Sequence, residues 1–412
     1  MRRLALLPRT ALTGCLALAC CLPLLAVAGC TSTPLPAPSG PASPAPSPSA
    51  PTASPSPSAE PAPTETTSPI PETHELDITE HETFDEPWAM AFLPGTDQLV
   101  ITGRQGDIWL RGPDGVREVG GAPDVVVAGQ GGLGDIIPGP TFEEDGRVYL
   151  SWVEGGGGTS GAVVGTGTLD VAAARLADLD VIWEQTPKVG GTGHFSHRLA
   201  IQGDYLFVSS GDRQKMDPAQ EMDGNLGKIL RLTLDGQPAE GNPFQGEDSP
   251  VAQQFWSVGH RNVLGLAFDA DGRLWASEMG PQGGDELNLI EPGANYGWPV
   301  ASNGSHYGGG EIPDHDPGDG FAAPKVWWNP SVSPGSLLIY TGDLFPAWTG
   351  DAFLGALSGE ALIRVDLDGE DAELAEDWPM GERIRAVAEA PDGAIWLLED
   401  GSGGRLLELR PA

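Results

Sequence analysis

One short unit recurs along most of this chain of 412 residues. A turn containing Gly or Asp is followed by four or five apolar or β-branched residues and then by another turn. Successive strands would start 49, 58, 68, 79 and 42 residues apart, at Leu99, Val148, Leu206, Leu274, Phe353 and Ile395. Short strands bounded by turns, with little helical periodicity between them, predict an all-β protein.

Six such units with irregular insertions are typical of a six-bladed β-propeller, in which four-stranded antiparallel sheets surround a central channel. An array of β-sandwiches is the alternative, because Asp-Gly turns are common in any hairpin. No second linker interrupts the region, so we predict one propeller domain over residues 75–412. Loops between the blades would gather at one end of the channel, where ligands would bind.

The N-terminal region has the order of an export signal, which we assign to residues 1–29. Arg2, Arg3 and Arg9 precede an apolar run that ends in Val27-Ala-Gly-Cys30,. This ending resembles a bacterial lipobox, with Cys30 as the lipid acceptor. An ordinary signal peptide or an uncleaved membrane anchor is the alternative.

The segment that follows would not fold. Residues 31–71 contain 14 prolines among Ser, Ala and Thr, and the first aromatic residue is Phe84. Residues 30–74 are therefore predicted to be a disordered spacer. Together, the two segments predict an exported protein that is attached to the outer face of the cell membrane only through a lipid on Cys30.

Composition excludes several functions. The chain has 58 acidic and 22 basic residues and a formal net charge of −36, so it has no basic face for a nucleic-acid partner,. All four cysteines lie within the first 30 residues. Neither a disulfide framework nor a Cys-ligated metal site is therefore possible in the predicted domain.

Gly129-Gln-Gly-Gly-Leu-Gly134 matches the G-x-G-x-x-G pattern and follows Val125–Ala128, which we predict to be a strand. A dinucleotide site would need a helix directly after the glycines. The chain continues instead with Ile136-Ile-Pro-Gly-Pro140, and closely spaced prolines do not open a long helix,. We interpret the glycines as a turn that permits close approach of the backbone.

His194 follows a Gly-rich stretch and is a candidate general base, because imidazole exchanges protons near neutral pH,. A structural turn residue is the alternative, and His197 is a nearby competitor. Arg261, Arg383 and Arg385 are candidates for binding carboxylates, and strand alternation would put the last two on one face. Ordinary salt bridges are their alternative.

Two loops are candidates for binding calcium. Glu278-Met-Gly-Pro-Gln-Gly-Gly-Asp-Glu286 and Asn295-Tyr-Gly-Trp-Pro299 combine acidic side chains with carbonyls in tight turns. Calcium takes oxygen ligands of both kinds. The spacing matches no EF-hand, so on these residues alone a solvated acidic loop is an equal alternative.

Taken in order, these motifs resemble the glucose/sorbosone dehydrogenase family, in particular the soluble aldose sugar dehydrogenases that use pyrroloquinoline quinone (PQQ). The resemblance runs from Glu86 to Leu409. It rests on Gly-Gln-Gly-Gly-Leu, His-Phe, Gly-His-Arg-Asn, Gly-Gly-Asp-Glu, Asn-Tyr-Gly-Trp-Pro and Arg-Ile-Arg. It implies a six-bladed propeller with the quinone at one end of the channel, and oxidation of the anomeric hydroxyl of an aldose sugar to the lactone.

The resemblance also implies roles for individual residues. His194 would take the proton from the sugar as hydride passes to the quinone, and electrons would then pass to an external acceptor that the sequence does not name. Calcium would be held at a structural site by Glu286 and the Tyr296 carbonyl, and beside the quinone by the carbonyls of Gly280 and Pro281. The residues that would line the quinone are Gln130, His260, Arg261, Asn262, Tyr307, Ala356, Leu357, Ser358, Arg383, Ile384 and Arg385.

The chain departs from the family pattern at two places. Ser358 stands where many members have a lysine, which removes a cation from the expected quinone site. Ser196 and His197 stand where Gly-Gly often follows His-Phe. Two other functions therefore stay open: a metal-dependent hydrolase of sugar lactones, which would need carboxylates converging in the channel, and a non-catalytic sugar-binding propeller of the cell surface.

Overall fold

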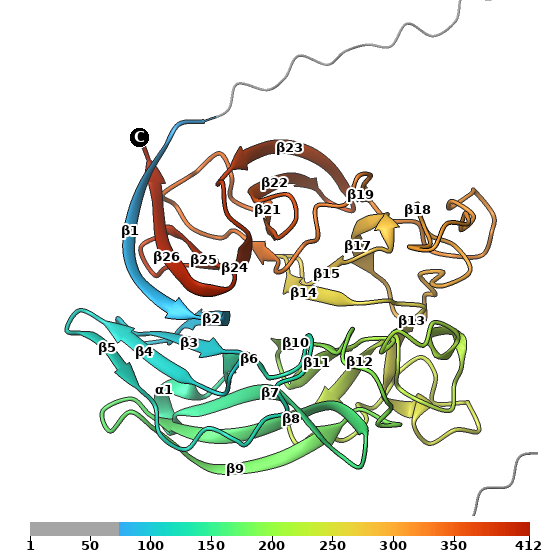
Figure 1. Cartoon of the computed structure of the whole chain (residues 1–412), viewed down its shortest axis with the longest axis horizontal. Helices are drawn as coiled ribbons and strands as arrows, with labels where there is room; N and C mark the ends of the chain where they lie inside the picture. The colour runs from blue at the N-terminus through green and yellow to red at the C-terminus, as the bar shows by residue number, and fades with distance from the viewer. Residues whose placement is uncertain (1–73) are drawn as a thin grey trace, which may run out of the picture. The chain divides into compact units, whose positions relative to one another are not determined.

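The computed structural model describes residues 74–412. They form six four-stranded antiparallel sheets arranged in a ring (Figure 1). The six-bladed β-propeller expected from the recurring units is therefore confirmed. The predicted signal peptide, Cys30 and all but the last residue of the spacer lie outside the described residues. None of the helices in the described region has the length and apolar character needed to span a membrane.

Five blades are built from strands that follow one another in the chain, from the channel outwards. The first two blades comprise β2 (Pro87–Phe92), β3 (Leu99–Gly103), β4 (Ile108–Gly112) and β5 (Gly115–Glu118), then β6 (Leu133–Pro138), β7 (Arg147–Gly156), β8 (Thr159–Asp170) and β9 (Arg175–Glu184). The next two comprise β10 (Ser196–Gln202), β11 (Tyr205–Ser210), β12 (Lys228–Thr233) and β13 (Phe255–Val258), then β14 (Val263–Phe268), β15 (Leu274–Glu278), β17 (Asp285–Ile290) and β19 (Val326–Trp328). The fifth comprises β20 (Leu338–Ile339), β21 (Ala352–Ala356), β22 (Ala361–Asp368) and β23 (Asp371–Pro379).

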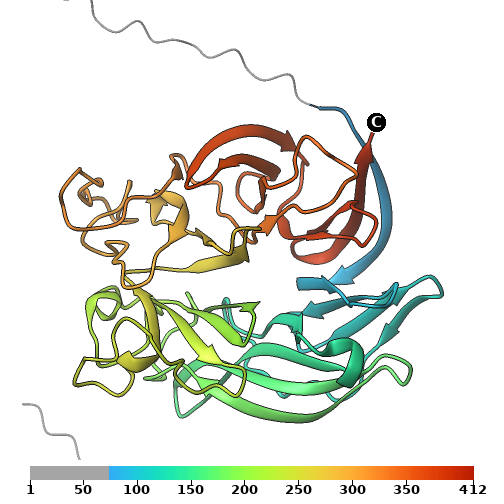
Figure 2. The same ribbon diagram turned by 180° about the vertical axis from the view of Figure 1, so that it is seen from behind.

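The sixth blade joins the two ends of the described chain. Its inner strands are β24 (Ile384–Glu389), β25 (Ile395–Glu399) and β26 (Ser402–Pro411), and its outer strand is β1 (Leu76–Asp85). Leu76 pairs with Pro411 and Asp85 with Ser402, so the first strand closes the ring against the last one (Figure 2).

Few other elements are present in residues 74–412. A two-stranded sheet joins β16 (Gln282–Gly283) to β18 (Gly304–Ser305) beside the fourth blade. The helices are short: α1 (Phe142–Asp145) and two 3₁₀ turns (Asp217–Gln220 and Ala252–Gln254).

The six strand starts predicted from the sequence fall in β3, β7, β11, β15, β21 and β25, the second strand of each blade. These strands have a neighbour on each side within their sheet and pack against adjoining blades on both faces. β3, β15, β21 and β25 are buried along their whole length. A strand that is buried on both faces reads as a continuous apolar run, which is why the sequence reveals it.

The predicted strand at Val125–Ala128 is wrong, because the segment has no regular structure. The Val126 amide donates one hydrogen bond to the Val153 carbonyl (2.8 Å), but no ladder forms. The glycines after it lead into β6 rather than into a helix, as expected for a turn. Gly132 has φ of 138°, and a Cβ there would lie 2.1 Å from the Arg104 carbonyl oxygen. The close backbone approach inferred from these glycines is therefore present.

Candidate active site

A cavity of about 440 Å³ lies at the end of the channel where the inner strands begin. Trp88 is near the start of β2, His197 near the start of β10 and Arg385 near the start of β24. Every blade contributes to the wall. The polar side chains that line the cavity are Glu86, Arg104, Gln130, Ser196, His197, Asn262, Tyr307, Ser333, Arg383, Arg385 and Asp400.

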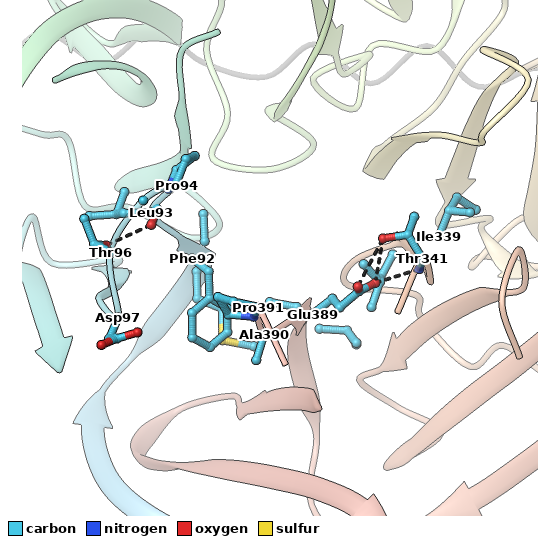
Figure 3. Close-up of a pocket in the computed structure, with 16 residues that line it drawn as sticks. Phe92, Leu93, Pro94, Thr96, Asp97, Ile339, Thr341, Glu389, Ala390 and Pro391 are labelled. Carbon is cyan, nitrogen blue, oxygen red and sulfur yellow. Dashed lines mark hydrogen bonds between the residues drawn. The ribbon is translucent and has the colours of Figure 1, made fainter. Parts of the chain in front are cut away.

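The opposite end of the channel is chemically different (Figure 3). An opening of about 720 Å³ lies where β2, β20 and β24 end, and its wall is mostly apolar. Its carboxylate Glu389 already accepts hydrogen bonds from the Thr341 amide (2.7 Å) and hydroxyl (3.1 Å). None of the site residues predicted from the sequence lines this opening. The candidate active site therefore lies at the end of the channel where the inner strands begin.

His194 and Asp212 form a buried pair beside the first cavity. His194 Nδ1 lies 2.7 Å from Asp212 Oδ1, and the two residues are 6% and 0% exposed. A carboxylate can only accept, so in the neutral imidazole Nδ1–H donates to it and Nε2 carries the lone pair. Gln130, which lines the cavity, accepts a hydrogen bond from the His194 amide (2.6 Å). His194 is thus held in the tautomer that a general base needs.

Asp212 is fixed by further donors. Its Oδ2 accepts a hydrogen bond from Trp298 Nε1 (2.8 Å), and its Oδ1 accepts one from the Gln214 amide (2.7 Å). His194 has φ of 50°, in the left-handed region that side chains rarely occupy,. Such backbone strain persists only where the surroundings impose it. The geometry of the pair is therefore set in advance by its neighbours.

Two buried basic side chains hold the loops that carry the pair. Arg213 Nη1 donates to the Ser160 carbonyl (2.6 Å), Nη2 to the Gly191 carbonyl (2.6 Å) and Nε to the Gly193 carbonyl (3.0 Å), directly before His194. Burial lowers the pKa of Arg213 to about 10, so it remains charged at neutral pH. Lys228 Nζ donates to three carbonyls of the loop after Asp212, those of Pro218 (2.7 Å), Ala219 (3.0 Å) and Leu226 (2.9 Å).

Guanidinium groups dominate the cavity wall. Arg383 Nε and Arg385 Nε donate to the two oxygens of Asp400 (2.9 and 2.8 Å), so the two arginines share a face as alternation predicted. Burial opposes ionisation of Asp400, but the guanidinium groups of Arg385 and Arg383 hold its pKa below the ordinary value. Arg104 Nη2 contacts both oxygens of Glu86 (2.9 and 2.8 Å). The salt bridges expected as the alternative therefore coexist with a cationic lining.

Arg261 lies behind the wall rather than in it. Its Nη1 donates to the Met279 carbonyl (2.8 Å) and its Nη2 to the Tyr307 hydroxyl (3.3 Å), and both of these residues line the cavity. Its Nε is completely buried and has no hydrogen-bond partner within residues 74–412. A buried donor without a partner is costly, so it marks a place where a ligand could complete the hydrogen bonding.

A smaller cavity of about 10 Å³ adjoins Arg261. Glu286, Gly280 and Tyr296, three of the four residues predicted to bind calcium, line it, whereas Pro281 does not. Glu278 also lines it and is paired directly with Glu286 across β15 and β17. Burial, together with the Glu278 carboxylate, raises the pKa of Glu286 to about 8. Two buried carboxylates in register do not readily ionise together, so a cation between them would favour the ionised form of Glu286.

The remaining predicted residues are dispersed. Leu357, Asn262 and Tyr307 line the cavity, whereas Ala356 and Ile384 are packed in hydrophobic cores between blades. His260 is buried away from the cavity: its Nε2 lies 2.8 Å from Ser257 Oγ and its Nδ1 lies 3.0 Å from Glu278 Oε2. The Ser358 hydroxyl lies 2.8 Å from Ser333 Oγ and donates to the Ser331 carbonyl (3.2 Å). The roles that the family resemblance implies for these residues therefore remain predictions.

Several residues of the site were not identified from the sequence. Asp212 and Arg213 follow the apolar strand β11 directly, and an acid and a base just after a strand end were the available signal. Asp285 belonged to a recognised motif, but its function as a clamp was not foreseen. Its carboxylate accepts hydrogen bonds from the amides of Gly280 (2.8 Å), Val332 (2.7 Å) and Ser333 (2.6 Å), which joins two loops at the site.

Comparisons with known proteins identify a family and several relatives. Residues 84–408 match the Glucose / Sorbosone dehydrogenase family. The chain is 36% identical over 353 residues to the aldose sugar dehydrogenase YliI of Escherichia coli K12, across 83% of this chain and 94% of that protein. The apo crystal structure of the soluble aldose sugar dehydrogenase of Escherichia coli is similar, with a TM-score of 0.79, 34% identity, and coverage of 82% of this chain and 100% of that one.

A structure of the PQQ-bound form of an aldose sugar dehydrogenase from Streptomyces coelicolor is also similar, with a TM-score of 0.66 and 31% identity. The match covers 82% of this chain and 99% of that one. The family match spans all six blades, from the end of β1 to β26. The chain therefore belongs to the glucose/sorbosone dehydrogenase family.

Proposed function

We propose that this protein oxidises the anomeric hydroxyl of an aldose sugar to the lactone, with PQQ as the bound cofactor and calcium as the metal. The observation that carries this proposal is the oriented His194–Asp212 pair beside a cavity walled by guanidinium groups. Family membership and the PQQ-bound relative support it. Electrons would then pass to an external acceptor.

The cavity fits the chemistry of PQQ. Its volume of about 440 Å³ lies within the range of cofactor pockets,. PQQ carries three carboxylates, and Arg104, Arg383 and Arg385 present guanidinium groups in the wall. Planar guanidinium groups bind carboxylates through paired charge-assisted hydrogen bonds. In a chain with a net charge of −36, a trianionic ligand needs such local cations in order to bind,.

Within the proposed reaction, the residues of this chain handle the proton. His194 Nε2 would accept the proton of the anomeric hydroxyl, and Asp212 would stabilise the imidazolium through Nδ1–H,. Asn262 and Gln130 would orient ligands from the wall. PQQ, when bound, supplies the two-electron acceptor for the hydride, which no side chain can provide.

The small cavity fits a calcium ion. Glu278 and Glu286 supply carboxylates from its wall. Asn288, whose Nδ2 donates to Glu286 Oε2 (3.0 Å), has a completely buried side-chain oxygen with no hydrogen-bond partner among residues 74–412. Calcium binds carboxylate and carbonyl oxygens together. A cation there would allow both paired glutamates to ionise and would hold the segment that carries Gly280 next to the quinone cavity.

We expect calcium to stabilise the wild-type protein and not the Glu286→Gln variant. The free energy of unfolding should rise by about 2–3 kcal/mol at a calcium concentration near 100 times Kd. Thermal unfolding with calcium and with a chelator measures this. Glu82→Gln, a change on β1 at the outside of the ring, serves as the control and should retain the full calcium effect. Equal stabilisation of Glu286→Gln and the wild type would contradict the assignment.

The two other functions raised by the sequence find less support. A metal-dependent lactone hydrolase would need carboxylate or histidine ligands converging on one ion. Residues 74–412 contain no group of three or more His, Cys, Asp or Glu side chains placed to hold a metal. A purely sugar-binding propeller would not require a buried imidazole held by a carboxylate in a single tautomer.

The test is a titration of the purified protein with PQQ in the presence of calcium, followed by absorbance, and then addition of an aldose with an artificial electron acceptor. We expect saturable binding and reduction of the acceptor that depends on the sugar. Absence of saturable binding at millimolar PQQ would overturn the proposal. The sugar-binding alternative would then be tested with the same sugars by calorimetry.

A further inference from the structure

His197 lies in the wall of the cavity of about 440 Å³, three residues after the proposed base. Its ring is 2% exposed and stacks on Trp88, with centroids 5.2 Å apart and planes inclined by 11°. Phe195 contacts it edge-on (6.4 Å). Gly134 leaves room for the ring, because a Cβ there would lie 2.1 Å from His197 Cε1. The surrounding residues therefore fix the position of the ring.

Hydrogen bonding also fixes the tautomer of His197. Ser151 Oγ lies 2.7 Å from the His197 carbonyl oxygen and 2.8 Å from Nδ1. A hydroxyl has one proton and a carbonyl can only accept, so the hydroxyl donates to the carbonyl. Nδ1 must then carry a proton and donate it to Ser151 Oγ. The other nitrogen, Nε2, is left with a lone pair and can only accept.

That acceptor is available and stays uncharged. No residue in the described region donates to Nε2, and this atom of a cavity-lining residue is not among the completely buried polar atoms without a partner, so it keeps some exposed surface for a ligand. Burial, reinforced by the charges of Arg198 and Arg213, lowers the pKa of His197 to about 3. The ring therefore remains a neutral acceptor at any pH at which the protein would be assayed.

The other strong groups of the cavity wall are donors or are already paired. Arg104, Arg383 and Arg385 can only donate. The two carboxylates, Glu86 and Asp400, are occupied by these same arginines. A hydrogen-bond donor on a ligand in this cavity can therefore pair with His197 Nε2. Among the charged and imidazole groups of the wall, this atom is the strong acceptor that the described residues leave unengaged.

We propose that His197 Nε2 accepts a hydrogen bond from the pyrrole N–H of bound PQQ; this inference rests on the proposed function. The carboxylates, quinone oxygens and pyridine nitrogen of PQQ all accept hydrogen bonds at neutral pH, and the pyrrole N–H is its donor. The arginines match the acceptors and His197 matches the donor. A residue that departs from the family pattern thus becomes a specific contact with the cofactor.

The test compares two substitutions, each of which can replace the hydrogen bonding of a different imidazole nitrogen. Asn at position 197 can retain the donor towards Ser151 but has no atom at Nε2, whereas Gln can place its amide oxygen near the Nε2 position. We expect the Kd for PQQ, from equilibrium titration without sugar, to rise about tenfold in His197→Asn, as for the loss of one hydrogen bond. His197→Gln should bind within about threefold of the wild type.

The possible outcomes distinguish a failure of this inference from a failure of the proposed function. Equal PQQ affinity in His197→Asn and the wild type would overturn the contact, and a change confined to the KM for sugar would reassign His197 to the substrate. No PQQ binding by the wild type would overturn both proposals. NMR of the wild type with ¹⁵N-labelled histidine provides a check that does not depend on how the variants fold. The His197 Nε2 resonance must shift when PQQ saturates the site, and an unshifted resonance would refute the contact.

Discussion

Replacing His194 with asparagine is expected to lower kcat by about 10²- to 10⁴-fold and to leave PQQ binding intact. The asparagine amide can still donate towards Asp212, but it has no basic atom in place of Nε2. The loss therefore reports proton transfer rather than a collapse of the site. Stopped-flow measurement of acceptor reduction, with a parallel PQQ titration, separates the two quantities.

Asp212→Asn should approach the same loss without removing the imidazole. The amide can place its oxygen towards His194 Nδ1 or towards Trp298 Nε1, but the NH₂ group then faces the other of these two donors. If the oxygen faces His194, the loop loses the hydrogen bond from Trp298 Nε1. If the oxygen faces Trp298, the proton of His194 moves from Nδ1 to Nε2. Either arrangement weakens the base.

A surface histidine provides the matched control for these variants. His81 lies on β1, where its Nε2 contacts Glu408 (2.9 Å) and its ring stacks on Trp396. His81→Asn should leave kcat within twofold of the wild type. Unchanged turnover in His194→Asn would exclude His194 as the base, and His197 could not replace it because burial keeps its pKa near 3.

Arg213→Met is expected to cost about 3–5 kcal/mol of unfolding free energy and to lower kcat at least tenfold. The substitution removes the guanidinium donors from the carbonyls of Ser160, Gly191 and Gly193. The Ser160 carbonyl keeps the Val189 amide (3.1 Å), whereas the carbonyl of the buried Gly193 loses its guanidinium partner. It also removes the guanidinium group that stacks on Phe195 (3.7 Å). Because Gly193 precedes His194, its release should move the base out of line, and small misplacements of catalytic groups reduce rates strongly.

Urea denaturation and steady-state kinetics on the same preparations measure the two effects of Arg213→Met. Arg231→Met is the matched control, since Arg231 stacks on Trp256 (4.4 Å) and donates to Asn242 (2.8 Å) at a distance from the cavity. It should lose stability and retain kcat. If Arg213→Met also kept its kcat, Arg213 would support the fold without positioning His194.

The sequence predicted the architecture because each blade has one strand that is buried on both faces. Outer strands carry a weaker signal: β1 is exposed at most of its positions, and its pairing with β26 depends on residues more than 300 positions away. Propensity and alternation describe neighbours in the chain. They cannot show which strand completes a sheet whose other three strands lie at the opposite end of the sequence.

The candidate site divides in the same way. Arg383 and Arg385 are two residues apart in the chain, so alternation predicted that they share a face, whereas Asp400, their shared partner, lies on another segment of the blade. The pairing of His194 with Asp212 depends on how two loops fold back over the ring. Ala356 and Ile384, assigned from motif order, have side chains that point into the core, because neighbouring residues of a strand face opposite sides,.

The pairing of β1 with β26 also has a consequence for how the protein folds. The sixth blade cannot be completed until β26 has been synthesised, since its outer strand β1 precedes the other five blades in the chain and its inner strands follow them. Contacts so distant in sequence form slowly. The same blade supplies Arg383, Arg385 and Asp400 to the cavity. A nascent chain that has finished five blades therefore has no complete cofactor pocket, and closure of the ring and formation of the pocket are one event.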